Sequence, residues 1–195
     1  MRRRGRMTIA LIVVLAVWAG WVYRATTREH ESALRIVYEE GEPSALVISH
    51  PGLSHYQQEM TAAFIDGLGA HGWRVALTTP SRAAPHGLGP YDLLVLAGPV
   101  YWWTPARPLR RYLEDLSPLD DMPTAILLTG AGSVAWARRM MEDEVVEAGG
   151  RIVSSSALTI MRPNDEDAMR AGEKNHATAL RMAREAALAI SLSVR

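Results

Sequence analysis

Residues 49–54 combine hydroxyl side chains with a glycine directly after a short apolar run. Exposed amides at a helix N-terminus, with short hydroxyl side chains beside them, suit a phosphate monoester. Gly52 would let the backbone approach the anion, Ser49 and Ser54 would donate hydrogen bonds, and Leu53 lies in the same loop. An ordinary strand–turn–helix connection with Ser54 as its N-cap explains the same residues. The glycine spacing matches neither the P-loop nor the dinucleotide-binding fingerprint.

Residues 98–104 place the aromatic residues Tyr101, Trp102 and Trp103 side by side. Neighbours in an extended loop point in different directions, so all of these rings cannot be core residues. Large aromatic rings exposed at a ligand-facing loop favour stacking on a flat ring, which an isoalloxazine supplies. Pro99 and Val100 lead into this loop and belong to the same candidate site. The alternative is that two rings pack against helices and the other is incidental.

Residues 129–133 form a third loop of small residues, with Thr129, Gly130 and Gly132 as candidate ligand contacts. Small residues leave room for the edge of a ring, and their amides can bond its polar rim. A glycine-rich turn that serves only backbone geometry is the alternative.

Each of these loops follows a short apolar run typical of a buried parallel strand. Five such runs alternate with helical patterns: 44–50, 73–77, 92–98, 124–129 and 151–160. Helices are expected around residues 60–68, from Thr104 with Pro105 in the first turn, from Ser133, and after Asn164. The pattern predicts an α/β fold with a doubly wound, five-stranded parallel sheet in the order 2-1-3-4-5. In that order a ligand sits between strands 1 and 3.

Residues 44–190 resemble the flavodoxin family and its relatives among FMN-dependent NAD(P)H:quinone oxidoreductases. The most specific stretch is 91–113, with Gly-Pro-Val-Tyr-Trp-Trp-Thr-Pro at 98–105 as its centre. The resemblance implies a flavodoxin-like fold and an FMN cofactor. It implies that Ser49, Gly52 and Ser54 hold the phosphate, that 101–103 stack on the flavin, and that 129–133 match the third loop loosely.

Pro51 departs from the short-chain flavodoxin pattern, in which a hydroxyl residue is usual at this position. Proline also removes a backbone N–H from the phosphate loop. A His-Pro pair followed by a serine does resemble some quinone-reductase relatives.

The resemblance implies that the flavin, not a side chain, carries the redox chemistry. The expected function is therefore electron transfer by an FMN protein, as a carrier or as an NAD(P)H:quinone oxidoreductase. Its partners would be a redox protein or a quinone, with NAD(P)H for a reductase. The alternative is a degenerate flavodoxin-like module without FMN that serves as a membrane-anchored interaction domain, which Pro51 favours.

No catalytic acid or base is evident. His50 and His55 lack partners at metal-ligand spacing, so no metal is expected.

Composition excludes several classes of protein. Lys and Arg together equal Asp and Glu at 21 each, and no basic stripe indicates a nucleic-acid partner. There is no cysteine, which excludes disulfides, thiol catalysis and iron–sulfur clusters.

The N-terminal segment is a candidate membrane anchor. Four arginines precede an uncharged run over residues 7–23, which as a helix spans about 26 Å. Trp18, Trp21 and Tyr23 lie at its C-terminal end, where aromatic rings prefer the membrane interface. The expected organisation is an anchor over 1–23, a juxtamembrane linker over 24–43, within which 33–38 suits a short strand or helix, and the flavodoxin-like domain over 44–195. The expected location is a single-pass transmembrane helix in a bacterial inner membrane, with the side of the domain open. A cleaved signal peptide is the alternative.

Overall fold

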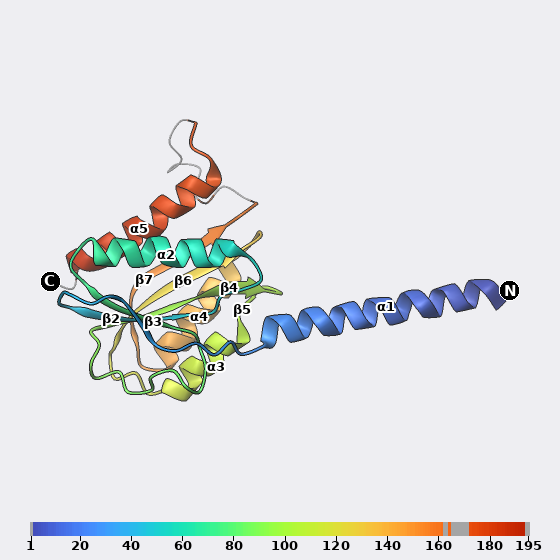
Figure 1. Ribbon diagram of the computed structural model, residues 1–195, viewed down its shortest axis with the longest axis horizontal. Coiled ribbons are helices and arrows are strands. Elements are labelled where there is room, and N and C mark those ends of the chain that lie inside the picture. Colours follow the sequence, from blue (N-terminus) through green and yellow to red (C-terminus); the bar gives the residue numbers. More distant parts are fainter. Residues whose placement is uncertain (1, 162–163, 165–171, 194–195) are drawn as a thin grey trace.

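The chain folds into a twisted sheet between two pairs of helices, with one long helix extending from the domain (Figure 1). This computed structural model describes residues 2–161, 164 and 172–193.

The sheet is mostly parallel and has the predicted strand order. The parallel strands lie in the order β3-β2-β4-β6-β7, which is 2-1-3-4-5 when they are counted along the chain. Their bounds are Ser44–Ser49 (β2), Arg74–Thr78 (β3), Leu93–Tyr101 (β4), Pro123–Gly130 (β6) and Arg151–Thr159 (β7). Two short strands pair antiparallel with them. Strand β1 (Arg35–Tyr38) extends the sheet beyond β3, and β5 (Thr104–Pro105) pairs with the end of β4.

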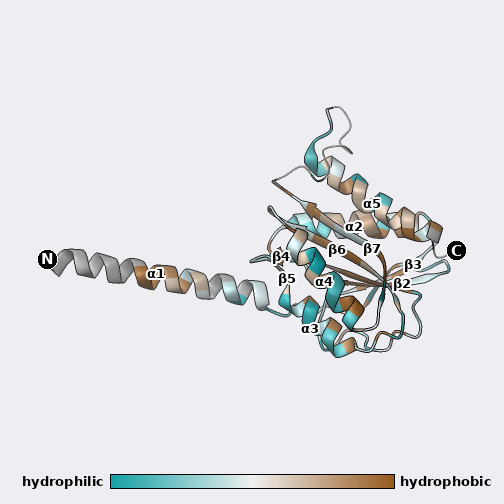
Figure 2. Cartoon of the chain, turned by 180° about the vertical axis from the view of Figure 1, so that it is seen from behind, coloured by the Kyte–Doolittle hydropathy of each residue, from teal (hydrophilic) through white to brown (hydrophobic). Residues whose placement is uncertain are grey.

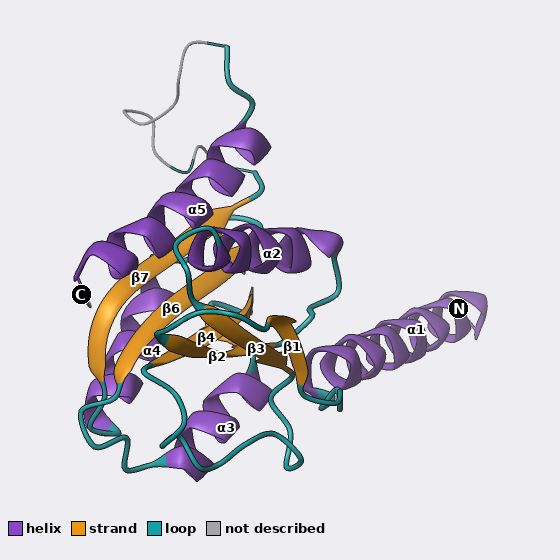
Figure 3. Cartoon of the chain, turned by 60° about the vertical axis from the view of Figure 1, so that its left-hand side comes forward, coloured by secondary structure: helices purple, strands orange, loops and turns teal. Residues whose placement is uncertain are grey.

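Helices cover both faces of the sheet because alternate residues of the central strands point to opposite faces. Helices α2 (His55–Gly69) and α5 (Asn175–Ser193) cover one face, and α3 (Arg107–Leu116) and α4 (Ala135–Glu147) the other (Figure 3). In β2, Val47 packs into the core beneath α2 and α5, whereas its neighbours Leu46 and Ile48 pack beneath α3 and α4. The strands therefore lie between two buried cores, one on each face of the sheet.

The structure corrects two predicted helix starts. Helix α3 begins at Arg107 rather than at Thr104, because Thr104 and Pro105 pair back onto β4 and the Thr104 hydroxyl donates to the Tyr101 carbonyl oxygen at 3.0 Å. Helix α4 begins at Ala135 with Val134 as its N-cap, one residue later than Ser133 would give.

Two other expectations concern segments at the margins of the domain. The sequence predicts the last helix after Asn164, and α5 begins at Asn175. Residues 162–163 and 165–171 lie outside the described residues. Within the predicted linker 24–43, residues 35–38 form β1 and pair with β3, so this part of the linker belongs to the sheet.

Helix α1 (Arg2–Thr27) extends away from the domain (Figures 1 and 2). Its C-terminal end lies against α3, where an Arg107 guanidinium N–H donates to the Tyr23 hydroxyl at 3.2 Å. Among the residues that the structure describes, no helix is both long and apolar enough to cross a membrane. The structure therefore supports a helix over 7–23 but not the predicted span.

Candidate functional site

The three predicted loops meet at the carboxyl edge of the sheet. A Cβ on Gly52 of the first loop would lie 3.3 Å from the Pro99 side chain at the end of β4. A Cβ on Gly130 at the end of β6 would lie 3.5 Å from the Val100 side chain. The end of β4 is thus in contact with both neighbouring loops. The parallel register of β2, β4 and β6 brings these ends together, as the sequence predicts.

The first loop turns sharply into α2. Gly52 has φ +73°, a left-handed conformation that glycine adopts without strain, and its N–H donates to His50 Nδ1 at 3.1 Å. Ser54 is the exposed N-cap of α2, and within the described chain its side chain makes no capping hydrogen bond. Leu53 is 57% exposed. The N-terminus of α2 therefore meets solvent with Gly52 and Ser54 beside it, as an anion site requires.

The second loop is a tight hairpin between β4 and β5. Tyr101 pairs with Thr104, which leaves Trp102 and Trp103 as the two central residues of the turn. Their φ angles are +51° and +62°, and the two side chains are 67% and 63% exposed. Positive φ at both central positions is the pattern of a type I′ turn, which normally takes Asn-Gly. Two tryptophans in this conformation are strained, and such strain concentrates at functional sites.

The third loop divides into a buried and an open part. Thr129 is buried, and its hydroxyl interacts with the Gln57 side chain at 2.5 Å. Gly130 is close-packed, because a Cβ there would meet the Val134 side chain, whereas no atom of the other described residues, chain neighbours aside, lies within 4 Å of a Cβ on Gly132. Gly132 is thus the member of this loop with open space beside it.

A buried polar network lies directly beneath the meeting point of the loops. The Ser49 and Thr61 hydroxyls lie 3.2 Å apart, and the Gln57 amide bonds Thr61 at 3.0 Å. With its amide turned so that donors meet acceptors, Gln57 also bonds the N–H and the carbonyl oxygen of Gly98, each at 3.2 Å. Gln57 thereby provides hydrogen-bond partners for the Gly98 backbone of β4, beyond the last residue of β2 that pairs with β4. Its side chain lies at the ends of β2 and β4, where the predicted ligand position begins. Ser49 and Thr129 consequently face this network.

Two polar atoms are buried beside the first loop: Nε2 of His50 and the hydroxyl of Tyr101. Burial lowers the pKa of His50 to about 4, although the backbone carbonyl of Arg28 opposes the shift. Burial also raises the pKa of Tyr101, against the effect of the Leu53 amide nearby. His50 and Tyr101 are therefore both neutral near pH 7.

Two cavities flank the meeting point. One of about 530 Å³ lies between the β1–β3 edge and α2 and includes Ser49 and Pro51. The other, of about 350 Å³, lies between the end of α1 and α3 and includes Tyr101 and Trp102. Its basic lining is Arg107, Arg110 and Arg111, and Arg110 is paired with Glu144 at 2.5 Å.

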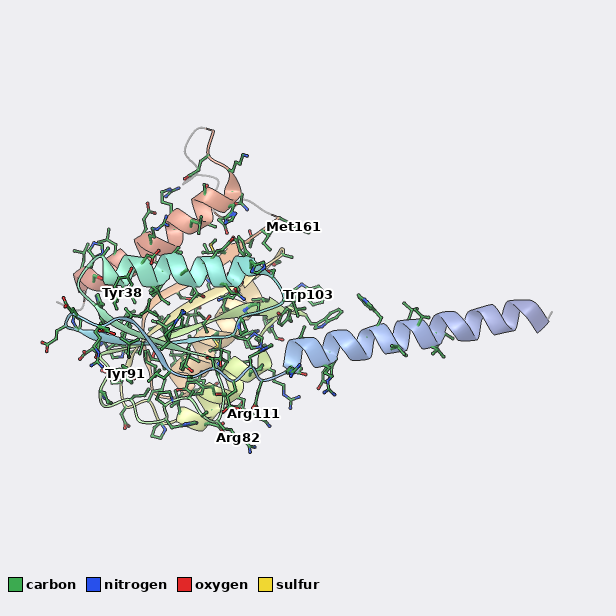
Figure 4. All side chains as sticks on the ribbon, in the orientation of Figure 1. Tyr38, Arg82, Tyr91, Trp103, Arg111 and Met161 are labelled. Carbon is green, nitrogen blue, oxygen red and sulfur yellow. The ribbon has the colours of Figure 1, made fainter. Side chains whose placement is uncertain are left out.

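Sequence reasoning missed several residues of this edge. Gln57 precedes the helical pattern over 60–68, and its bonds to Gly98 depend on β2 ending opposite that residue. Trp136 at the start of α4 and Met161 after β7 are 64% and 80% exposed. Figure 4 places Trp103 and Met161 on the same side of the domain. A pattern of exposed aromatic residues after strand ends would have found Trp136, whereas no sequence signal marks Met161.

The residues present fit FMN at this edge. The α2 N-terminus with Gly52 and Ser54 suits the phosphate, and the exposed indoles of Trp102 and Trp103 suit a flat ring.

Comparison with known proteins gives structural matches only. No family model matches the sequence, and no curated protein is detectably similar to it. A flavodoxin from the domain Archaea is similar with a TM-score of 0.62 and 12% identity, over 78% of this chain and 99% of that one. Flavodoxin 2 from Bacillus cereus gives 0.59 and 18%, over 77% and 99%. The NAD(P)H:quinone oxidoreductase from Methanothermobacter marburgensis gives 0.56 and 15%, over 74% and 94%.

The matched flavodoxins are covered almost completely, whereas 78% and 77% of this chain lie within the two matches. At these identities the likeness concerns the fold. The chain therefore has a flavodoxin-like α/β fold with a mostly parallel sheet.

Proposed function

We propose that this domain binds FMN at the carboxyl edge of its sheet and takes part in electron transfer. The observation that carries the proposal is the strained hairpin that holds Trp102 and Trp103 exposed where the ends of β2, β4 and β6 meet. A two-residue turn without a ligand role would favour Asn-Gly over two bulky rings.

Each loop has a distinct task in this proposal. Gly52 and Ser54 hold the phosphate at the N-terminus of α2, and Trp102 and Trp103 pack against the flat ring. The backbone of Gly132 meets the polar rim, where open space is present. Bound FMN would supply reversible uptake of one or two electrons, while the protein provides binding, orientation and electrostatics.

The double variant Trp102→Ala/Trp103→Ala tests this assignment. We expect the wild-type chain to quench the fluorescence of added FMN, and the double variant to lose this quenching because the ring contacts are gone. Val146→Ala is the matched control, since Val146 is 61% exposed on α4 at a distance from the loops. Equal FMN affinity in the wild type and the double variant would contradict the role of the two rings.

An interaction module without FMN is the second candidate. Pro51 lacks a backbone N–H in the phosphate loop, and the Gln57 side chain lies at the ends of β2 and β4, where it bonds Gly98. This candidate predicts a colourless protein with no absorbance near about 450 nm even after FMN is added. A yellow protein after FMN addition and desalting would exclude it.

A carrier and a reductase differ in turnover. A reductase would oxidise NAD(P)H in the presence of a quinone without a second enzyme, whereas a carrier would need one. The flavodoxins and the quinone oxidoreductase among the structural matches support both forms of the proposal equally.

We also propose that α1 holds the protein at a membrane, a bacterial inner membrane being the expected one. The support is the uncharged run over residues 7–23 and the exposure of the apolar side chains from Ile12 to Trp18. Membrane fractions of cells that express the full chain should retain it after an alkaline carbonate wash. Recovery in the wash would contradict this location.

A further inference from the structure

Large apolar side chains gather in the open at the carboxyl edge of the sheet. They come from the connections after β2, β4 and β7 and from the first turn of α4, which follows β6. We call them the carboxyl-edge patch: Leu53, Trp102, Trp103, Trp136, Ile160 and Met161, each between 47% and 80% exposed.

Hydrogen bonds and close contacts join several of the segments that carry the patch. The Ile160 N–H donates to the Gly130 carbonyl oxygen, and the Met161 N–H to that of Ala131, both at 3.0 Å. These bonds join the end of β7 to the third loop. The third loop contacts β4 through Gly130 and Val100, and β4 leads directly to the tryptophan hairpin. Single exposed apolar residues need no explanation, but a gathering of this kind marks an interaction surface.

Helix α1 extends from this same side of the domain. In Figures 1 and 2 it leaves next to the ends of β4 and β5 and points away from the carboxyl edge. Figure 4 places the labelled Trp103 on the side facing α1. The apolar side chains of α1 are also exposed: Ile12, Val13, Val14, Leu15, Val17 and Trp18. Whatever surrounds this stretch of α1 therefore lies in front of the patch.

Basic side chains surround the junction between α1 and the domain. Arg24, Arg28 and Arg107 are exposed there, and Arg111 pairs with Glu29 at 3.5 Å. Arginines next to an apolar segment attract the phosphates of anionic lipids. Tryptophan prefers the region between headgroups and acyl chains, because its ring is apolar and its N–H is polar.

We propose that the carboxyl-edge patch rests on the lipid–water interface of an anionic membrane, with α1 held at the same membrane. The proposal relies on the membrane location given above for α1. It does not need FMN, but it places any flavin at this edge next to partners dissolved in the lipid. The occupant of the patch is thus a lipid surface.

The absence of cysteine from the chain allows a clean test. A spin label is attached to Met161→Cys in the patch, and in a second protein to Ala70→Cys. Ala70 is exposed at the C-terminal end of α2, at the opposite edge of the sheet. Both full-length proteins are bound to vesicles of phosphatidylcholine and phosphatidylglycerol. Collisions of each label with oxygen, which concentrates in lipid, and with a water-soluble nickel chelate are then measured.

We expect the label at position 161 to lose collisions with the nickel chelate and to gain collisions with oxygen when vesicles are present, with or without FMN. The label at position 70 should keep its values in solution. If the protein binds vesicles and the label at 161 stays in water, the patch proposal is overturned while the membrane location of α1 stands. If the protein does not bind vesicles, both fail, and the FMN titration remains an independent measurement.

Discussion

At the scale of single residues, the tryptophan hairpin combines strain with exposure. A left-handed backbone costs a residue with a side chain about 1–2 kcal/mol, and Trp102 and Trp103 both adopt it. Because both side chains are mostly exposed, their contacts within the domain offset little of this conformational free energy. The sequence places two aromatic rings where the backbone would prefer asparagine and glycine, which is expected of a site kept for binding.

Replacing the pair by Asn-Gly separates stability from binding. We expect the variant Trp102→Asn/Trp103→Gly to be more stable than the wild type by about 1–2 kcal/mol, because type I′ turns favour these residues. Its FMN affinity should fall. Thermal unfolding and an FMN titration on the same preparations measure both effects.

Trp136→Asn is the control for this prediction. Trp136 is similarly exposed, at 64%, but lies in α4 with ordinary helical geometry. It should show no gain in stability. A loss of stability in the hairpin variant would mean that the tryptophans stabilise the domain and are not strained.

His50 makes stability depend on pH. Its side chain is 1% exposed, and burial lowers its pKa from 6.5 to about 4. His50 therefore binds a proton below about pH 6.5 in the unfolded chain, but only below about pH 4 in the folded chain. The stabilisation is complete above pH 6.5 and falls as the pH drops through this window, by up to about 1.4 kcal/mol for each pH unit.

The variant His50→Asn isolates this contribution. Asparagine does not titrate, and its side-chain oxygen can replace Nδ1 as the acceptor for the Gly52 N–H. Urea unfolding at pH 7 and at pH 5 should show a smaller difference between the two pH values in the variant than in the wild type. Identical differences would show that His50 is not buried in its neutral form.

At the scale of elements, the strands were predictable because buried parallel strands are short, apolar and bounded by turn residues. The expected run 124–129 became β6 (Pro123–Gly130), and 44–50 became β2. The start of α3 was not predictable from Thr104 and Pro105, because both residues suit a helix N-terminus and a hairpin strand alike. Pairing with β4, a tertiary interaction, decided between the two.

The sequence also predicts which loops form the candidate site, but not the orientation of every side chain in them. Parallel strands deliver their loops to one edge, so the meeting of the first and second loops followed from topology. The inward orientation of Ser49 and Thr129 did not, because it depends on the Gln57 side chain reaching them across the end of β2. The exposure of Trp102 and Trp103 agrees with the prediction that the aromatic loop cannot be wholly buried.

Helices α2 and α5 approach closely at a glycine. A Cβ on Gly67 would lie 2.8 Å from the Ala187 Cβ and 3.0 Å from the Arg184 carbonyl oxygen. Gly→Ala inside a helix normally stabilises it by about 1 kcal/mol. At this position we expect the opposite sign for Gly67→Ala, a loss of about 1–3 kcal/mol, because the helices must separate. Chemical denaturation measures the change.

The double variant Gly67→Ala/Ala187→Gly provides the control, because it removes the Cβ that Gly67→Ala would meet. Part of the lost stability should return, so that the two substitutions are not additive. Additive losses would show that the contact with Ala187 does not limit the approach of the helices.

At the scale of the whole molecule, a flavodoxin-like domain carries a long N-terminal helix beside its carboxyl edge. The two cores hold the strand ends in fixed register, and the loops at those ends provide a helix N-terminus, two exposed indoles and open space beside Gly132. These parts form one site only if they contact the same ligand at both its phosphate and its ring.

Titration of the full chain with FMN and, separately, with riboflavin tests this claim most directly, with flavin fluorescence as the signal. Riboflavin carries the same ring without the phosphate. We predict saturable quenching by the protein for FMN and much weaker binding of riboflavin, because the phosphate contacts at Gly52 and Ser54 are lost. Absence of quenching for both compounds, or equal affinity for the two, would contradict a site that holds phosphate and ring together.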